Sequence, residues 1–127
     1  MKAPVMLLAC LLLGGAISRV APAQQPQELY DEAAKAVAAA DQRLNAAYGK
    51  LIDDIKKSNG QDRAKMVIEQ LRESQRAWLK YREAQVHFVG LYSDIGSSSA
   101  RAAGLSSYNV ELTNSRIADL VNVPNPF

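Results

Sequence analysis

The residues in this chain that could do chemistry are one acid and two arginines on the apolar sides of predicted helices. Asp41 shares its face with Leu44 and Tyr48, Arg82 borders the apolar side of a second segment, and Arg116 lies on that of a third. A carboxylate inside an apolar stripe is costly unless it is paired, and the guanidinium fork suits it well. We therefore predict a partly buried polar cluster in which Asp41 meets Arg82, Arg116 or both. Its other expected members are Asn45, Gln75 and Thr113.

Two interpretations of this cluster are open. In the first, it is a structural ion pair that fixes the register of the helices. Asp41→Ala would then lower the free energy of unfolding by on the order of 3–5 kcal/mol, because the substitution leaves an arginine without its partner. In the second, the cluster is a ligand-binding or proton-handling site, because buried ion pairs also occur at functional sites.

No catalytic set can be assembled from the remaining residues. His87 is the one histidine and is expected to face solvent, and Cys10 is the one cysteine. The adjacent acids of Asp53-Asp54 diverge by about 100 degrees on a helix, so they cannot converge on a metal or a glycosidic bond. We therefore predict a protein that is not an enzyme and that uses no metal or other cofactor.

Three helices are expected to position the cluster. Apolar residues recur in steps of three and four over residues 28–57 and again over 62–92, with a stop at Ser58-Asn59-Gly60 and Asp62 as the expected N-cap. A Gly/Ser linker at 93–99 leads to a third segment at 100–121. The prediction is an all-α fold without strands. It is a three-helix antiparallel bundle, with two long helices in a hairpin plus a shorter C-terminal helix.

The aromatic side chains of the two long segments are expected to fill the core. On a helical wheel, one side of the second segment carries Leu71, Trp78, Tyr81, Gln85 and Phe88. Tyr48 lies on the apolar side of the first. Aromatic residues at helical spacing are more often core than a ligand box, so we predict that Tyr48, Trp78, Tyr81 and Phe88 are buried.

The first 23 residues have the features of a signal peptide. Lys2 precedes an apolar run at 6–17, and Ala21-Pro22-Ala23 forms a cleavage site, so cleavage is expected after Ala23 and the protein should be periplasmic or secreted. Lipoprotein processing at Cys10 is the alternative. The apolar run is too short to span a bilayer. The expected organisation is then a signal peptide at 1–23, a helical domain at 24–122 and a C-terminal tail at 123–127.

The charge of the expected mature chain excludes nucleic acid as a partner. Lys2 and Arg19 leave with the signal peptide, so 13 basic residues face 13 acidic ones. A balanced chain of this kind has no basic patch for phosphate binding.

Three motifs give the chain a family resemblance. They are Asp41-x-x-Leu44-Asn45-x-x-Tyr48, then QRAW at 75–78 followed by YREA at 81–84, then Leu112-Thr113-x-x-Arg116-x-x-x-Leu120. Over roughly residues 28–121 the chain resembles the LprI-type lysozyme-inhibitor-like family of small exported helical domains. Family members commonly carry cysteines at the places held here by Val86 and Tyr108. The resemblance therefore implies that these two residues face each other without a disulfide.

The resemblance implies a non-enzymatic protein that binds another protein, with lysozyme or a related wall hydrolase as one target. The loop Asp94, Ile95, Gly96, Ser97 and Ser98 is the candidate partner-binding element, because it is small and polar enough to enter a glycan cleft. An immunity-type or scaffold partner of another envelope protein is a second hypothesis. A self-associating module is a third, because long helices can pair between chains, so a monomer or a weak homodimer is expected.

Overall fold

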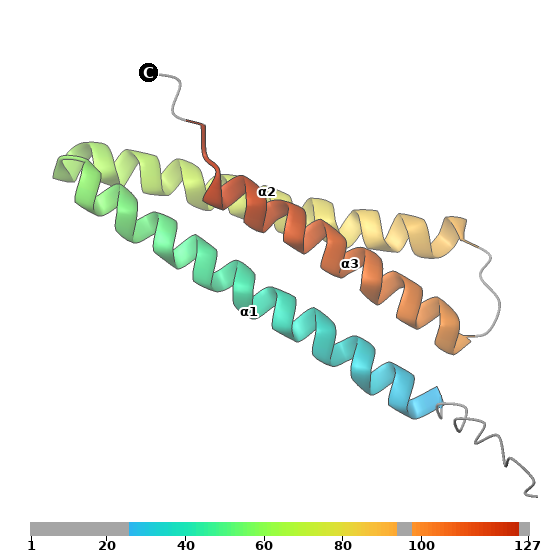
Figure 1. The fold of residues 1–127 in the computed structure, drawn as a ribbon. Coiled ribbons are helices and arrows are strands. Elements are labelled where there is room, and N and C mark those ends of the chain that lie inside the picture. Colours follow the sequence, from blue (N-terminus) through green and yellow to red (C-terminus); the bar gives the residue numbers. More distant parts are fainter. Residues whose placement is uncertain (1–25, 94–97, 125–127) are drawn as a thin grey trace, which may run out of the picture.

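The chain folds into three helices connected in simple up-and-down order. The computed structural model describes residues 26–93 and 98–124. Helix α1 spans Pro26–Ser58, α2 spans Gln61–Tyr92 and α3 spans Ser98–Val121. Helices α1 and α2 form an antiparallel hairpin, and α3 then runs back in the same direction as α1 (Figure 1). The predicted all-α, three-helix fold is confirmed, and the described residues contain no strand.

The tight turn between α1 and α2 is stabilised by local hydrogen bonds. The Asn59 side-chain amide donates to the Ile55 carbonyl at 2.8 Å, which satisfies one of the free carbonyls at the end of α1. Helix α2 begins differently from the prediction. Its N-cap is Gly60, in extended backbone and without a side-chain cap, whereas Asp62 lies in the first turn. A carboxylate there still interacts favourably with the helix dipole, which explains why Asp62 looked like a cap.

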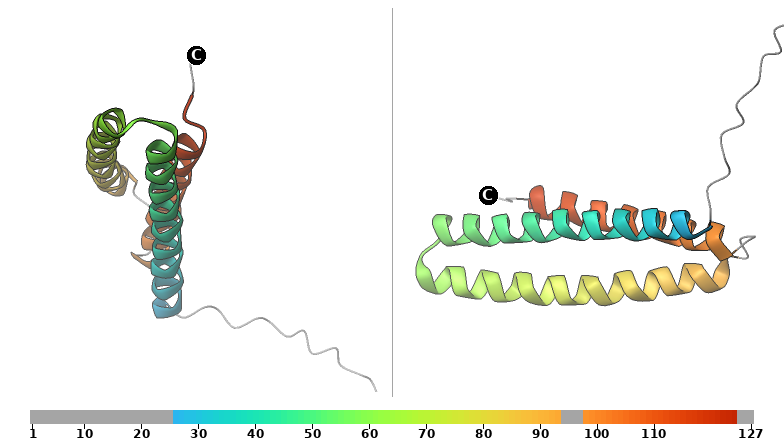
Figure 2. Two further views of the ribbon diagram at one scale, coloured as in Figure 1. Left: turned by 90° about the vertical axis from the view of Figure 1, so that its left-hand side faces the viewer. Right: turned by 90° about the horizontal axis from the view of Figure 1, so that it is seen from below.

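The three helices do not pack equally. Helix α1 packs extensively along α3, although these helices are the most distant in sequence, and α2 makes far fewer contacts with either. Figure 2 shows α1 and α3 as a close pair, with α2 standing to one side. Helix α2 comes close to α3 at the buried Gly90, where an added Cβ atom would lie 3.2 Å from Leu105 Cδ1.

The core is narrow. Its buried apolar side chains are Ala40 and Leu44 in α1, Ala64 and Ile68 in α2, and Leu120 in α3. Thr113 is the one polar residue among the buried side chains of the described chain, with no exposed surface. The core therefore surrounds a polar position instead of excluding it.

The expectation that Tyr81 and Phe88 belong to the core is wrong. Tyr81 is 52% exposed and Phe88 is 56% exposed. The face of α2 that meets the other helices carries Ile68, Gln75 and Arg82, and on a helical wheel it is rotated by about 90 degrees from the predicted aromatic stripe. Helix α2 has more apolar surface than the narrow α1–α3 pair can cover, so periodicity alone pointed to the wrong side. Trp78 and Tyr48, nearer the covered face, are partly buried.

Several predictions fall on residues outside the described ranges. The signal peptide at 1–23 is one, and most of the candidate loop and of the C-terminal tail are others. Among the helices that the structure describes, none combines the length and the apolar character that a membrane crossing requires.

Candidate functional site

Arg82 is the centre of the polar contacts between the helices. Its Nη1 atom donates to Asp41 Oδ1 at 2.5 Å and to Thr113 Oγ1 at 2.9 Å, so one guanidinium connects all three helices. The Thr113 hydroxyl in turn donates to the Asn109 carbonyl at 2.8 Å. The Arg82 guanidinium also lies over the Trp78 ring, 5.0 Å from its centroid, where the π face attracts a cation.

Arg116 takes different partners. Its Nε donates to Gln75 Oε1 at 3.1 Å, and its Nη2 donates to Ser74 Oγ at 2.8 Å. Because α3 runs antiparallel to α2, Arg116 lies about one turn beyond Thr113, level with an earlier turn of α2. The structure therefore brings Asp41 together with Arg82 and Thr113, and it places Arg116 and Gln75 in a second, neighbouring contact.

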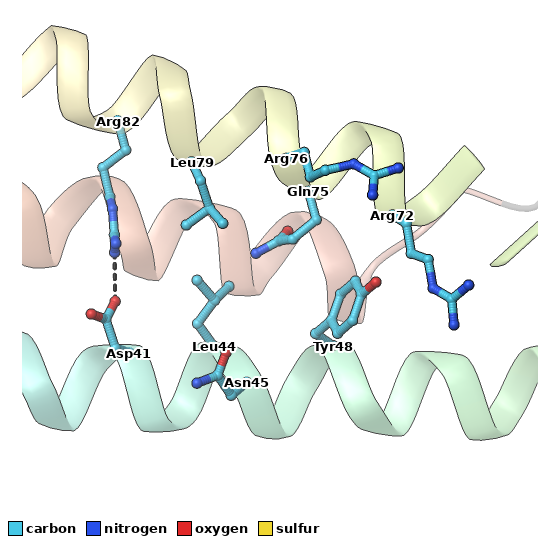
Figure 3. A pocket seen from close by; sticks show the side chains of 9 residues that line it. All are labelled: Asp41, Leu44, Asn45, Tyr48, Arg72, Gln75, Arg76, Leu79 and Arg82. Atoms are coloured by element: carbon cyan, nitrogen blue, oxygen red, sulfur yellow. Dashed lines mark hydrogen bonds and ion pairs between the residues drawn. The ribbon is translucent and has the colours of Figure 1, made fainter. Parts of the chain in front are cut away.

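A groove opens between α1 and α2 beside these contacts. Its volume is about 320 Å³. Leu44 and Leu79 point toward each other across it, and the Asp41–Arg82 pair lies at one end (Figure 3). The remaining lining residues are polar or charged: Asn45, Tyr48, Arg72, Gln75 and Arg76. A small apolar contact bordered by hydrogen-bonding groups on two rigid helices is a suitable shape for binding a partner's side chain.

The charges at the groove are arranged in two levels of burial. Arg72 and Arg76 are exposed and pair with Glu69, and Arg76 also binds Glu73. The hydrogen bond from Arg76 to Glu73 raises the pKa of the guanidinium, so this cation stays charged. Asp41 differs, because its side chain is 41% exposed whereas Arg82 is only 16% exposed. The Arg82 guanidinium is thus held inside the protein, whereas the Asp41 carboxylate is open to the groove.

Two further polar features were not found by sequence reasoning. The Gln85 amide donates to the Tyr108 hydroxyl at 3.1 Å, which connects α2 and α3 close to Val86. The side-chain oxygen of Asn109 is buried, and within the described residues it has no hydrogen-bond partner. Neither could be read from helical spacing, because both depend on how α3 is rotated against α2.

The described residues contain no group of three or more His, Cys, Asp or Glu side chains that could hold a metal ion. The donor set at the groove is instead one carboxylate, two amides, a phenol and guanidinium groups. Such a set can bind another molecule through hydrogen bonds and charge.

Comparison with known proteins gives one match. The family model described as "Lysozyme inhibitor LprI" matches residues 18–120, which include all three helices except the last residue of α3. The chain belongs to the LprI family. No curated protein and no solved structure gives a match to it. The LprI family is described as one of inhibitors, not as one of enzymes.

The motif residues of this LprI chain have distinct positions. Tyr48 lines the groove, Trp78 supports Arg82, and Tyr81 points outward from α2. Of the candidate loop, residues 94–97 lie outside the described ranges, and Ser98 is the exposed first residue of α3.

Proposed function

We propose that this chain is an exported, non-enzymatic inhibitor that binds lysozyme or a related wall hydrolase through the groove between α1 and α2. The observation that carries the proposal is the LprI family match, because it extends over almost the whole three-helix unit and not over a short motif. Lysozymes act outside the cytoplasm, so the target and the expected signal peptide are consistent with each other.

The groove supports the binding role through Asp41. Arg82 fixes one carboxylate oxygen, and among the described residues Arg82 is the one that binds this side chain. The carboxylate is therefore held in one orientation, while part of it stays open to a donor from outside. A fixed acceptor loses little conformational freedom on binding, which is the usual advantage of a preorganised contact.

The chemistry of the groove suggests what enters it. A lysine or arginine of the target would place its charge near Asp41 and its aliphatic stem against Leu44 and Leu79, as long cationic side chains commonly do. Lysozymes are often basic proteins, so such side chains are common on their surfaces. The Asn45 amide could donate and accept further hydrogen bonds with the target, and Gln75 Nε2 could donate one, because Gln75 Oε1 already accepts from Arg116.

An inhibition assay tests the target and the groove together. Wild-type mature chain is expected to slow the clearing of a cell-wall suspension by lysozyme in a concentration-dependent way. Asn45→Arg fills the groove with a cation and is expected to weaken inhibition by about tenfold or more. Gln42→Arg is the matched control, because it adds the same charge at an exposed position of α1 outside the groove lining.

The outcomes separate the parts of the proposal. No inhibition by the wild-type chain over a wide concentration range would exclude lysozyme as the target. Inhibition that Asn45→Arg leaves unchanged would exclude the groove. In that case a loss of inhibition in Ser97→Arg would support the loop at 94–98 as the binding element.

A further inference from the structure

One face of α2 carries an apolar stripe that the other described residues leave largely exposed. Its members follow one another in steps of three and four residues and are all exposed: Ser74, Ala77, Tyr81, Ala84, Phe88 and Leu91. Ser74, at one end, also accepts a hydrogen bond from Arg116 of α3. This is the spacing of the contact positions in a coiled coil. The stripe contains no charged side chain, and Tyr92 extends it by stacking on Phe88 with ring centroids 5.8 Å apart.

The exposed area is large for a free surface. Tyr81 is 52% exposed, Phe88 56%, Leu91 72% and Tyr92 81%. At roughly 200 Å² for each large side chain, these four expose about 500 Å² per chain, which is near the upper end for the apolar patches of monomeric proteins. Two such patches in contact would bury about 1,000 Å², which is the lower limit of a specific interface. The area therefore fits a weak, reversible association.

The order of residue sizes along the stripe identifies the occupant. In an antiparallel pair of helices, a register that places Tyr81 opposite Ala84 of a second copy also places Phe88 opposite Ala77. The same register places Leu91 opposite Ser74. Tyr81, Phe88 and Leu91 then each meet a small side chain, and the arrangement is symmetric about a two-fold axis between residues 82 and 83. We propose that this stripe, residues 74–92 of α2, is the docking surface for a second copy of the same chain.

Charge favours this register over the register shifted by one heptad. If the helices slid by one heptad so that Tyr81 faced Ala77 of the second copy, Lys80 at the edge of the stripe would come close to its own equivalent. Like charges directly opposed across a helix pair are destabilising. In the proposed register, the nearest residue to Lys80 on the same edge of the second copy is instead His87. None of the stripe residues lines the groove, so the pairing leaves the groove open.

Sedimentation velocity on the purified mature chain tests the association. A reversible dimer with a micromolar dissociation constant is expected for the wild-type chain. Ala84→Glu should raise this constant by about tenfold or more, because it places a charge opposite Tyr81. Ala46→Glu makes the same change at an exposed position of α1 and should leave the constant unchanged. A wild-type chain that stays monomeric at several hundred micromolar, or equal effects of the two variants, would overturn the proposal.

Cysteine cross-linking tests the register. Cys10 lies in the expected signal peptide, so the mature chain supplies no competing thiol. An equimolar mixture of Ala77→Cys and Phe88→Cys chains should form a disulfide between unlike chains under mild oxidation. Ala77→Cys alone should not cross-link, because its two copies would be about 16 Å apart along the antiparallel pair. Efficient cross-linking of Ala77→Cys with itself would show a parallel pair and refute the two-fold arrangement. These results do not depend on whether lysozyme is the target.

Discussion

Arg82 and Asp41 are in direct contact, but solvent reaches them to different extents. Arg82 Nη1 lies 2.5 Å from Asp41 Oδ1, and the arginine side chain is 16% exposed whereas the aspartate side chain is 41% exposed. If its partner is removed, the aspartate can be hydrated from the groove, whereas the arginine remains largely inside the protein. The two partners of this ion pair are therefore not equivalent for stability.

Substitutions at this pair should show the inequality. Asp41→Ala strands a guanidinium that is mostly buried and should lower the free energy of unfolding by about 1–3 kcal/mol, less than for a fully buried pair because of the exposed carboxylate. Arg82→Met keeps contact with Trp78, leaves a carboxylate that water can reach, and should cost about 1 kcal/mol. Urea denaturation followed by Trp78 fluorescence measures both. An Arg82→Met variant less stable than Asp41→Ala would contradict the asymmetry.

Gly49 and Gly90, both within helices, should respond differently to alanine. Gly49 in α1 has open space around it, so Gly49→Ala should raise the free energy of unfolding by about 0.5–1 kcal/mol through helix propensity alone. At Gly90 the same gain is offset, because the new methyl group meets Leu105 Cδ1 at 3.2 Å and this side chain must shift. Thermal unfolding should therefore show a higher Tm for Gly49→Ala and little change for Gly90→Ala. Gly90→Leu adds a larger side chain at this position and should lower the free energy of unfolding by about 1–3 kcal/mol.

Asp54 should titrate at a lower pH than an ordinary aspartate. The hydrogen bond from Lys50 holds the pKa of this carboxyl below its ordinary value of 3.8. A carboxyl with a lowered folded-state pKa contributes stability above the unfolded pKa and loses it as the pH falls through the folded pKa. The contribution is therefore lost only below about pH 4, and it is small because the pair is exposed. NMR titration should show the low pKa, and Lys50→Ala should return it toward 3.8. An unchanged pKa in that variant would exclude Lys50 as the cause.

Backbone protection should follow the unequal packing of the helices. Helices α1 and α3 share the most extensive interface, whereas α2 has few contacts with either. Hydrogen exchange measured by mass spectrometry should therefore show faster exchange in the middle of α2 than in the middle of α1 and α3. Dilute protein is needed, because pairing through α2 would slow its exchange. Equal protection of the three helices in dilute solution would show that α2 is docked as firmly as the others.

Most of the fold could be predicted from the sequence, because helix limits depend on local signals. The expected segments at 28–57, 62–92 and 100–121 differ from the observed helices by two residues or fewer at each end. The rotation of α2 was predicted wrongly. Trp78, Tyr81 and Phe88 form the more apolar side, but the covered side carries Gln75 and Arg82, whose polar groups bind α1 and α3. Hydrophobic periodicity cannot identify a helix face that is held by hydrogen bonds.

The polar contacts were predictable as a set of residues but not as a set of pairs. Asp41 was expected to meet either of two arginines, and the choice depends on the stagger between α1 and α3. That stagger places Thr113, with no exposed surface, level with Asp41 and moves Arg116 one turn along. Stagger follows from side-chain packing between distant segments, which a single sequence does not reveal.

The close pairing of α1 with α3 has a consequence for the order of events in the cell. The first helix finds its main partner only when the last one has been made, so the hairpin alone has little apolar interior to hold it together. Nearly the whole polypeptide must be present before a stable structure can form, which postpones folding until synthesis is almost complete. Such a delay suits a protein that crosses a membrane as an unfolded chain and folds on the other side.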